Sequence, residues 1–122
     1  MKKIILTSAI LLSGMITYAQ TTVKFTSILA NNTGTTITTE SILAEPKVAA
    51  MPTPSTVSSF VVSFKPVKGD LIGPFDINGN MLTQRELDIV KKLKAGDRIF
   101  IDNVKVTSGK EFTAGNAIYT VK

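Results

Sequence analysis

Apolar and polar residues alternate along several short segments of the chain, as they do in half-buried β-strands. The clearest segment is residues 57–65, VSSFVVSFK, in which Phe60, Val62 and Phe64 share one face. Successive side chains of a strand point to opposite faces, so this face is predicted to lie in the core. The same reasoning predicts strands at residues 22–29, 35–38, 75–77, 98–106 and 117–121.

The strand at residues 98–106 changes phase part of the way along. Ile99 and Ile101 occupy odd positions, whereas Val104 and Val106 occupy even ones. One extra residue in the strand would keep all four side chains on the same face. The sequence therefore predicts a β-bulge near Asp102 and Asn103.

Residues 83–95 are predicted to form the one helix of the domain. Thr83 is suited to the N-cap, and Glu86 three residues later completes a capping box. Leu82 and Leu87 have the spacing of a hydrophobic staple across the first turn.

The predicted end of this helix is rich in lysine. Lys91, Lys92 and Lys94 are expected in the last turn, where positive charge complements the helix dipole, and Gly96 is expected to end the helix. The three lysines are interpreted as solvated charges; the alternative is a cluster that docks an acidic partner or anionic headgroups.

Between the first strands and residue 57 the pattern is weaker. Residues 39–44 fit either a helical turn or a short strand. Pro52 and Pro54 predict a connection at 51–55, because proline cannot donate to a strand ladder. Several short strands and one helix favour a mainly β fold, a β-sandwich, with a single domain over residues 20–122.

The first nineteen residues have the features of a secretory signal peptide. Two lysines precede an apolar run at residues 4–16, and cleavage is expected between Ala19 and Gln20. An uncleaved anchor is the alternative, but it needs about 20 apolar residues. With no later apolar run and no cysteine to carry a lipid, the mature domain is expected in the periplasm or outside the cell, without a membrane span.

The composition removes most catalytic chemistry. The chain has no histidine and no cysteine, which excludes Ser/His and Cys/His catalysis and the usual zinc sites. No catalytic, cofactor-binding or metal-binding residue is predicted, and the protein is not expected to be an enzyme. A carboxylate pair of the glycosidase type would have to come from Asp70, Asp76, Glu86, Asp88, Asp97, Asp102 and Glu111.

Two further patterns are interpreted in plain structural terms. Residues 76–80, DINGN, begin like a calcium loop, but glycine falls at the fourth position and Leu87 at the twelfth, where an EF-hand needs an acid. An Asn-Gly turn is therefore expected. Without Lys2 and Lys3, twelve basic and nine acidic residues remain, a net charge of +3 that is spread along the chain, and no nucleic-acid binding is expected.

Three stretches resemble the C-terminal domain of the GldM family: VSSFVVSF (57–64), GNMLTQRELDIVKKLKAGDRIFIDNVKV (79–106) and AIYTVK (117–122). GldM proteins act in gliding motility and type 9 secretion in Bacteroidota, joining an inner-membrane motor to an outer-membrane ring. The resemblance implies an immunoglobulin-like β-sandwich and a role in protein–protein contact. GldM proteins are several times longer and carry a transmembrane helix, so a free-standing version without a motor role is expected.

The sequence thus favours an exported, non-catalytic protein–protein interaction module of the bacterial cell envelope, linked by the resemblance to gliding motility or protein secretion. The alternative is a periplasmic or secreted β-domain that binds a small ligand or glycan, or inhibits an enzyme. The identity of the protein partner, the binding surface and a homodimer are all left open by the sequence.

Overall fold

The computed structural model describes residues 24–122, so the proposed cleavage site at Ala19 and Gln20 lies outside the described residues. In chain order the elements are β2 (Thr26–Leu29), β3 (Thr36–Ile37), α1 (Thr39–Ala44), β4 (Val48–Met51), β5 (Thr56–Lys65), β6 (Ile72–Asn78), α2 (Gln84–Val90), β7 (Arg98–Ser108), β8 (Lys110–Thr113) and β9 (Ala117–Val121).

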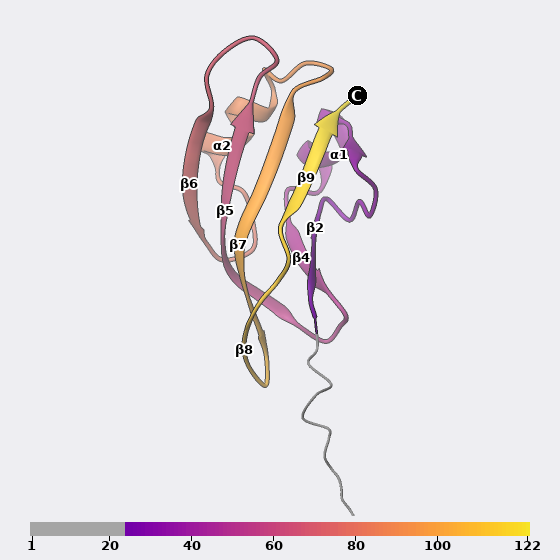
Figure 1. Ribbon diagram of the computed structural model, residues 1–122, viewed down its shortest axis with the longest axis vertical. Helices are drawn as coiled ribbons and strands as arrows, with labels where there is room; N and C mark the ends of the chain where they lie inside the picture. Colours follow the sequence, from indigo (N-terminus) through magenta and orange to yellow (C-terminus); the bar gives the residue numbers. More distant parts are fainter. Residues whose placement is uncertain (1–23) are drawn as a thin grey trace, which may run out of the picture.

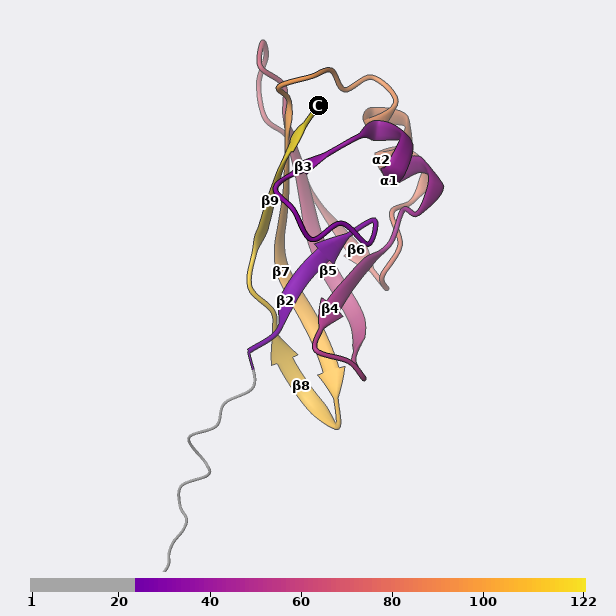
Figure 2. The same ribbon diagram turned by 90° about the vertical axis from the view of Figure 1, so that its right-hand side faces the viewer.

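The strands form two sheets that pack on each other. The larger sheet has the order β3-β9-β7-β5-β6, with β8 added beside β7, and only the β3–β9 pair is parallel. Strands β2 and β4 form the second, antiparallel sheet, which lies against one face of the larger one (Figure 2). Helices α1 and α2 contact each other and lie together in Figure 2. The prediction of a mainly β, two-sheet fold is confirmed.

The centre of the larger sheet is the pair β5 and β7. Phe60, Val62 and Phe64 are almost completely buried, as the alternation predicted. Val62 faces Ile101 across the ladder, and Phe64 faces Ile99. These side chains belong to one hydrophobic cluster that also includes residues of the smaller sheet. One core therefore holds both sheets together.

The predicted bulge in β7 is confirmed. The ladder steps from Ser59 opposite Lys105 to Val61 opposite Asp102, so three steps on β7 match two on β5. Asn103 takes the extra position with φ of 52°, in the left-handed region that asparagine tolerates better than most residues. The buried valines that follow therefore stay on the same face as the buried isoleucines before them.

Helix α2 begins as predicted but ends earlier. Glu86 Oε1 accepts a hydrogen bond from the Thr83 backbone N–H at 2.8 Å, which completes the capping box. The predicted end near residue 95 is wrong, because the helix ends at Val90 and no lysine lies in its last turn. After Lys91 the chain tightens: the backbone N–H of Lys92 donates to Ile89 O and that of Leu93 to Val90 O, both bonds spanning three residues.

Gly96 has a φ of +97°, the left-handed geometry that the sequence suggested. It does not end the helix, however, because it lies five residues after Lys91, the C-cap of α2. The three clustered lysines therefore lie on a loop instead of a helical turn.

The weakly patterned region before residue 57 contains two elements. Residues 39–44 form α1, with the Thr38 side chain accepting from the Ser41 N–H at 3.2 Å. Strand β4 was not predicted, and it buries Val48 and Ala50 against the core. Residues 52–55 form the connection that the prolines indicated, and Met51 belongs to β4. The hairpin strand β8 was also not predicted, and β6 begins at Ile72, three residues before the predicted start.

Candidate functional site

A half-open pocket of about 600 Å³ lies at one end of the larger sheet, between two loops. One loop joins β5 to β6 at residues 66–71, and the other joins α2 to β7 at residues 91–97. The pocket is lined by Pro66, Val67, Lys68, Ile72, Ile89, Lys92, Leu93, Lys94, Ala95 and Asp97.

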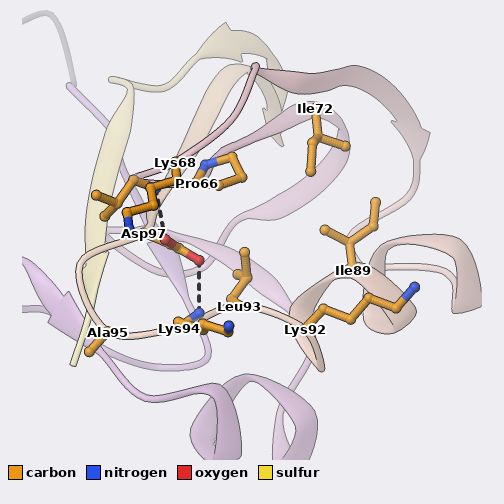
Figure 3. Close-up of a pocket in the computed structure, with 10 residues that line it drawn as sticks. Pro66, Lys68, Ile72, Ile89, Lys92, Leu93, Lys94, Ala95 and Asp97 are labelled. Carbon is orange, nitrogen blue, oxygen red and sulfur yellow. Dashed lines mark hydrogen bonds between the residues drawn. The ribbon is translucent and has the colours of Figure 1, made fainter.

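Aliphatic side chains from three elements form the floor of the pocket. Ile72 comes from β6, Ile89 from α2 and Leu93 from the loop after α2, and in Figure 3 they converge on the same space. Each is partly buried and packs against the core. The floor is thus an extension of the core that is left partly open to solvent.

The buried carboxylate of Asp97 joins the two loops. Its Oδ1 accepts the backbone N–H of Val67 at 2.9 Å, and its Oδ2 accepts that of Lys94 at 2.8 Å (Figure 3). The side chain is only 6% exposed, and hydrogen bonds to an ionised acceptor are among the stronger ones in proteins. Asp97 therefore fixes the spacing of the loops, and both of its oxygens are occupied.

Three exposed lysines are among the residues that line the pocket. Lys68 comes from the first loop, and Lys92 and Lys94 come from the second. Residues 24–122 contain two ion pairs, Lys47–Glu45 and Arg85–Glu86, and neither involves these lysines. The sequence singled out Lys92 and Lys94 as solvated charges at a helix end, with docking of an acidic partner or anionic headgroups as the alternative. Lys91 does not line the pocket.

Lys65, the last residue of β5, stabilises the first loop through two hydrogen bonds. Its Nζ donates to the carbonyl oxygens of Pro66 at 2.9 Å and Gly69 at 2.7 Å. Its positive charge is therefore directed at the backbone of the loop that carries Lys68.

Glu86, the other buried carboxylate, serves α2 instead of a reaction centre. It accepts from the Thr83 hydroxyl and backbone N–H and from Arg85 Nε, the last at 2.6 Å. Burial acts to raise the pKa of Glu86, but these hydrogen bonds outweigh it and hold the pKa below its usual value. Arg85 also stacks over the Phe75 ring at 4.3 Å from the centroid, which ties α2 to β6.

The remaining acids considered as catalytic candidates are distributed over several elements. Asp70 and Asp76 are exposed on the first loop and on β6, and Asp88 accepts a hydrogen bond from Gln84 at 2.8 Å. Asp102 lies on β7 and Glu111 on β8. Within residues 24–122, no group of three or more acidic, histidine or cysteine residues is placed to hold a metal ion.

The segment first considered as a calcium loop forms a turn. Gly79 adopts φ of +103° directly after Asn78, the last residue of β6. The Gly79 N–H donates to Ser58 O at 2.7 Å, which anchors this turn to β5. The expectation of an Asn-Gly turn is confirmed.

A second, smaller pocket of about 360 Å³ lies between β2 and β9. Tyr119 lines this pocket, and its hydroxyl accepts the Leu29 N–H and donates to Asn32 O, both at 2.9 Å. Burial raises the pKa of Tyr119. The Asn32 side chain is also engaged, with Thr36 O at 3.0 Å and the Gly34 N–H at 2.8 Å. Much of the polar lining is thus used within the protein.

The described chain is a mainly β protein of two packed sheets whose most distinctive surface is the lysine-rimmed pocket. In the described part of the chain, no helix is long and apolar enough to cross a membrane. Comparison with protein-family models and with curated proteins finds no match for this sequence.

Proposed function

We propose that this chain is an exported, non-catalytic protein–protein interaction module of the bacterial cell envelope, and that its partner binds at the pocket between the two loops. The observation that carries the proposal is the combination at this one place of an open aliphatic floor and three lysines that form no ion pair within residues 24–122. Protein interfaces commonly combine an apolar centre with a polar rim.

The topology supports the immunoglobulin-like assignment that the GldM resemblance implies. The order β9-β7-β5-β6 corresponds to the G-F-C-C′ order of an immunoglobulin sheet, and the antiparallel β2–β4 pair corresponds to strands A and B. Helix α2 lies between β6 and β7, where an immunoglobulin domain has further strands of its second sheet. Because many unrelated functions use such sandwiches, the binding role rests on the pocket and not on the fold.

A photocrosslinking experiment tests the proposed site. A photoreactive amino acid placed at Leu71, beside the pocket, is expected to crosslink to a protein in intact cells. The same amino acid at Lys110, on the hairpin at the far end of the molecule, is the matched control (Figure 1). Equal crosslinking from the two positions would contradict a binding site at the pocket.

Export and processing are tested separately. The mature protein is expected to begin at Gln20 and to be recovered from the periplasm or the medium. Recovery of only the uncleaved precursor in the cytoplasm would contradict the envelope role, whatever the crosslinking shows.

The alternative function, binding of a glycan or small ligand, draws on the second pocket, whose eleven lining residues include three threonines and two asparagines. A rise in melting temperature with a soluble glycan or small molecule, abolished by a bulky substitution at Asn116, would support it. A wild-type protein whose melting temperature stays constant across a glycan panel would contradict it.

A further inference from the structure

The floor of the lysine-rimmed pocket presents aliphatic carbon to any occupant. Ile72, Ile89 and Leu93 meet there, and the only acid among the lining residues, Asp97, has both oxygens bonded to backbone N–H groups. An aliphatic side chain placed on this floor would lose contact with water without facing an unpaired polar group. Such burial contributes about 25 cal/mol per Å² of apolar area.

The charged residues at the rim of the pocket, all lysines, are positive. Lys68 stands on the loop at residues 66–71, and Lys92 and Lys94 stand on the loop at residues 91–97, so both loops bring positive charge to the pocket. The single acid of the lining is buried beneath them and already hydrogen-bonded. A concave surface of this kind attracts negative charge and sets the orientation of what enters.

The apolar surface continues outward along the first loop. Val67 and Leu71 are 63% and 50% exposed. Val67 is held against the turn at Gly96, where a Cβ atom would come within 3.0 Å of Val67 Cγ2. Exposed apolar side chains therefore precede and follow Lys68 along this loop.

We infer that this pocket binds an acidic peptide segment of a partner protein, with one aliphatic side chain on the floor and carboxylates beside Lys68, Lys92 and Lys94. The inference rests on the proposed function and names the chemistry of the partner. A membrane surface fits less well, because binding to a bilayer needs apolar side chains that project into it, whereas Ile72, Ile89 and Leu93 are partly buried against the core.

The test uses a fluorescent synthetic peptide that carries one leucine between two pairs of aspartates. Binding to residues 20–122 is measured by fluorescence anisotropy at low and at moderate salt. Two control peptides replace the leucine by glycine or the aspartates by asparagines. We expect the parent peptide to bind at least about tenfold more tightly than either control, and its affinity to fall as salt screens the lysines.

Charge reversal at the rim provides the matched variants. The double variant Lys92→Glu with Lys94→Glu is expected to weaken binding of the parent peptide at least about tenfold, because it replaces two positive charges by negative ones. The pocket should keep its shape, since Asp97 accepts a hydrogen bond from the backbone N–H of Lys94 and not from its side chain. Lys24→Glu with Lys110→Glu makes the same change in net charge away from the pocket and is expected to leave affinity within about twofold. Equal unfolding midpoints would show that both variants are folded.

The remaining outcomes overturn the inference. These are no binding of the parent peptide, binding that tolerates glycine in place of leucine, or binding to phosphatidylglycerol vesicles without binding to the peptide. If the peptide fails while photocrosslinking at Leu71 still captures a protein, the interaction module stands and only the acidic chemistry of the partner is wrong.

Discussion

The centre of the larger sheet is formed by β5 and β7, whereas the pocket lies at the loops next to these strands, and the two regions are stabilised differently. In the centre, Phe60, Val62 and Ile101 are at most 1% exposed, and the β5–β7 ladder holds their backbone. At the pocket, Ile72 and Leu93 are only partly buried, and two loops are held together through the carboxylate of Asp97.

This difference separates stability from binding. Apolar area in the sheet centre is removed from water when the chain folds, so it contributes to the free energy of unfolding. Apolar area left open at the pocket contributes little to folding and is available to a partner. Substitutions in the sheet should therefore change stability, and substitutions at the pocket should change affinity.

The largest expected effect is in the sheet centre. Phe60→Ala removes a buried ring opposite Ile77 and leaves a cavity, so the free energy of unfolding should fall by about 3–5 kcal/mol. Urea unfolding measures the loss. Leu71→Ala, at a half-exposed position beside the pocket, is the contrasting variant and should change stability by about 0.5 kcal/mol or less. Similar losses of stability in Phe60→Ala and Leu71→Ala would show that the sheet centre and the pocket do not differ in their contribution to folding.

The Asp97 carboxylate is buried and joins the two loops of the pocket, so its removal should affect both stability and binding. Asp97→Ala leaves the N–H groups of Val67 and Lys94 without their acceptor and should cost about 2 kcal/mol of stability. It should also weaken binding of the acidic peptide, although every lysine remains, because the loops are no longer held at a fixed spacing. Urea unfolding and peptide titration measure the two effects, and full affinity in a destabilised variant would show that the loops keep their spacing without the carboxylate.

The lowered pKa of Glu86 predicts that the stability of the protein depends on pH. Hydrogen bonds lower the folded-state pKa of Glu86 below its unfolded value, so its contribution to stability is present above the ordinary glutamate pKa of about 4.3. The contribution is lost as the pH falls through the folded-state pKa. Glu86→Gln should therefore be less stable than wild type at pH 7, by about 1 kcal/mol, and the gap should narrow in acid. Urea unfolding across that pH range measures the gap; a constant gap would show that another group is responsible.

Sequence patterns predicted the sheet centre well because its residues are large and alternate strictly. The face shared by Phe60, Val62 and Phe64 is recognisable from a single segment. Strand β4 was not predicted from the sequence for two reasons. Its sequence, VAAM, has two alanines, which are poor strand formers, and its burial depends on pairing with β2.

The pocket could not be predicted from local patterns. Apolar spacing through Leu93 continues the helical period beyond Val90, yet the chain leaves the helix there. The deciding contact is the hydrogen bond from Val67 to Asp97, thirty residues apart in sequence. The lysines were visible in the sequence, but their arrangement at one pocket depends on this long-range bond.

The smallest expected effect tests the bulge, which a change of phase in the sequence was sufficient to predict. Asn103 has positive φ, a conformation that costs an alanine about 1 kcal/mol and a glycine almost nothing. Asn103→Ala should therefore lower the free energy of unfolding by about 1 kcal/mol, while Asn103→Gly should stay within about 0.5 kcal/mol of wild type. Both variants should bind the acidic peptide unchanged, because the bulge lies in the sheet and away from the two loops. A loss of affinity in Asn103→Ala without loss of stability would show that the sheet centre and the pocket are coupled through β7.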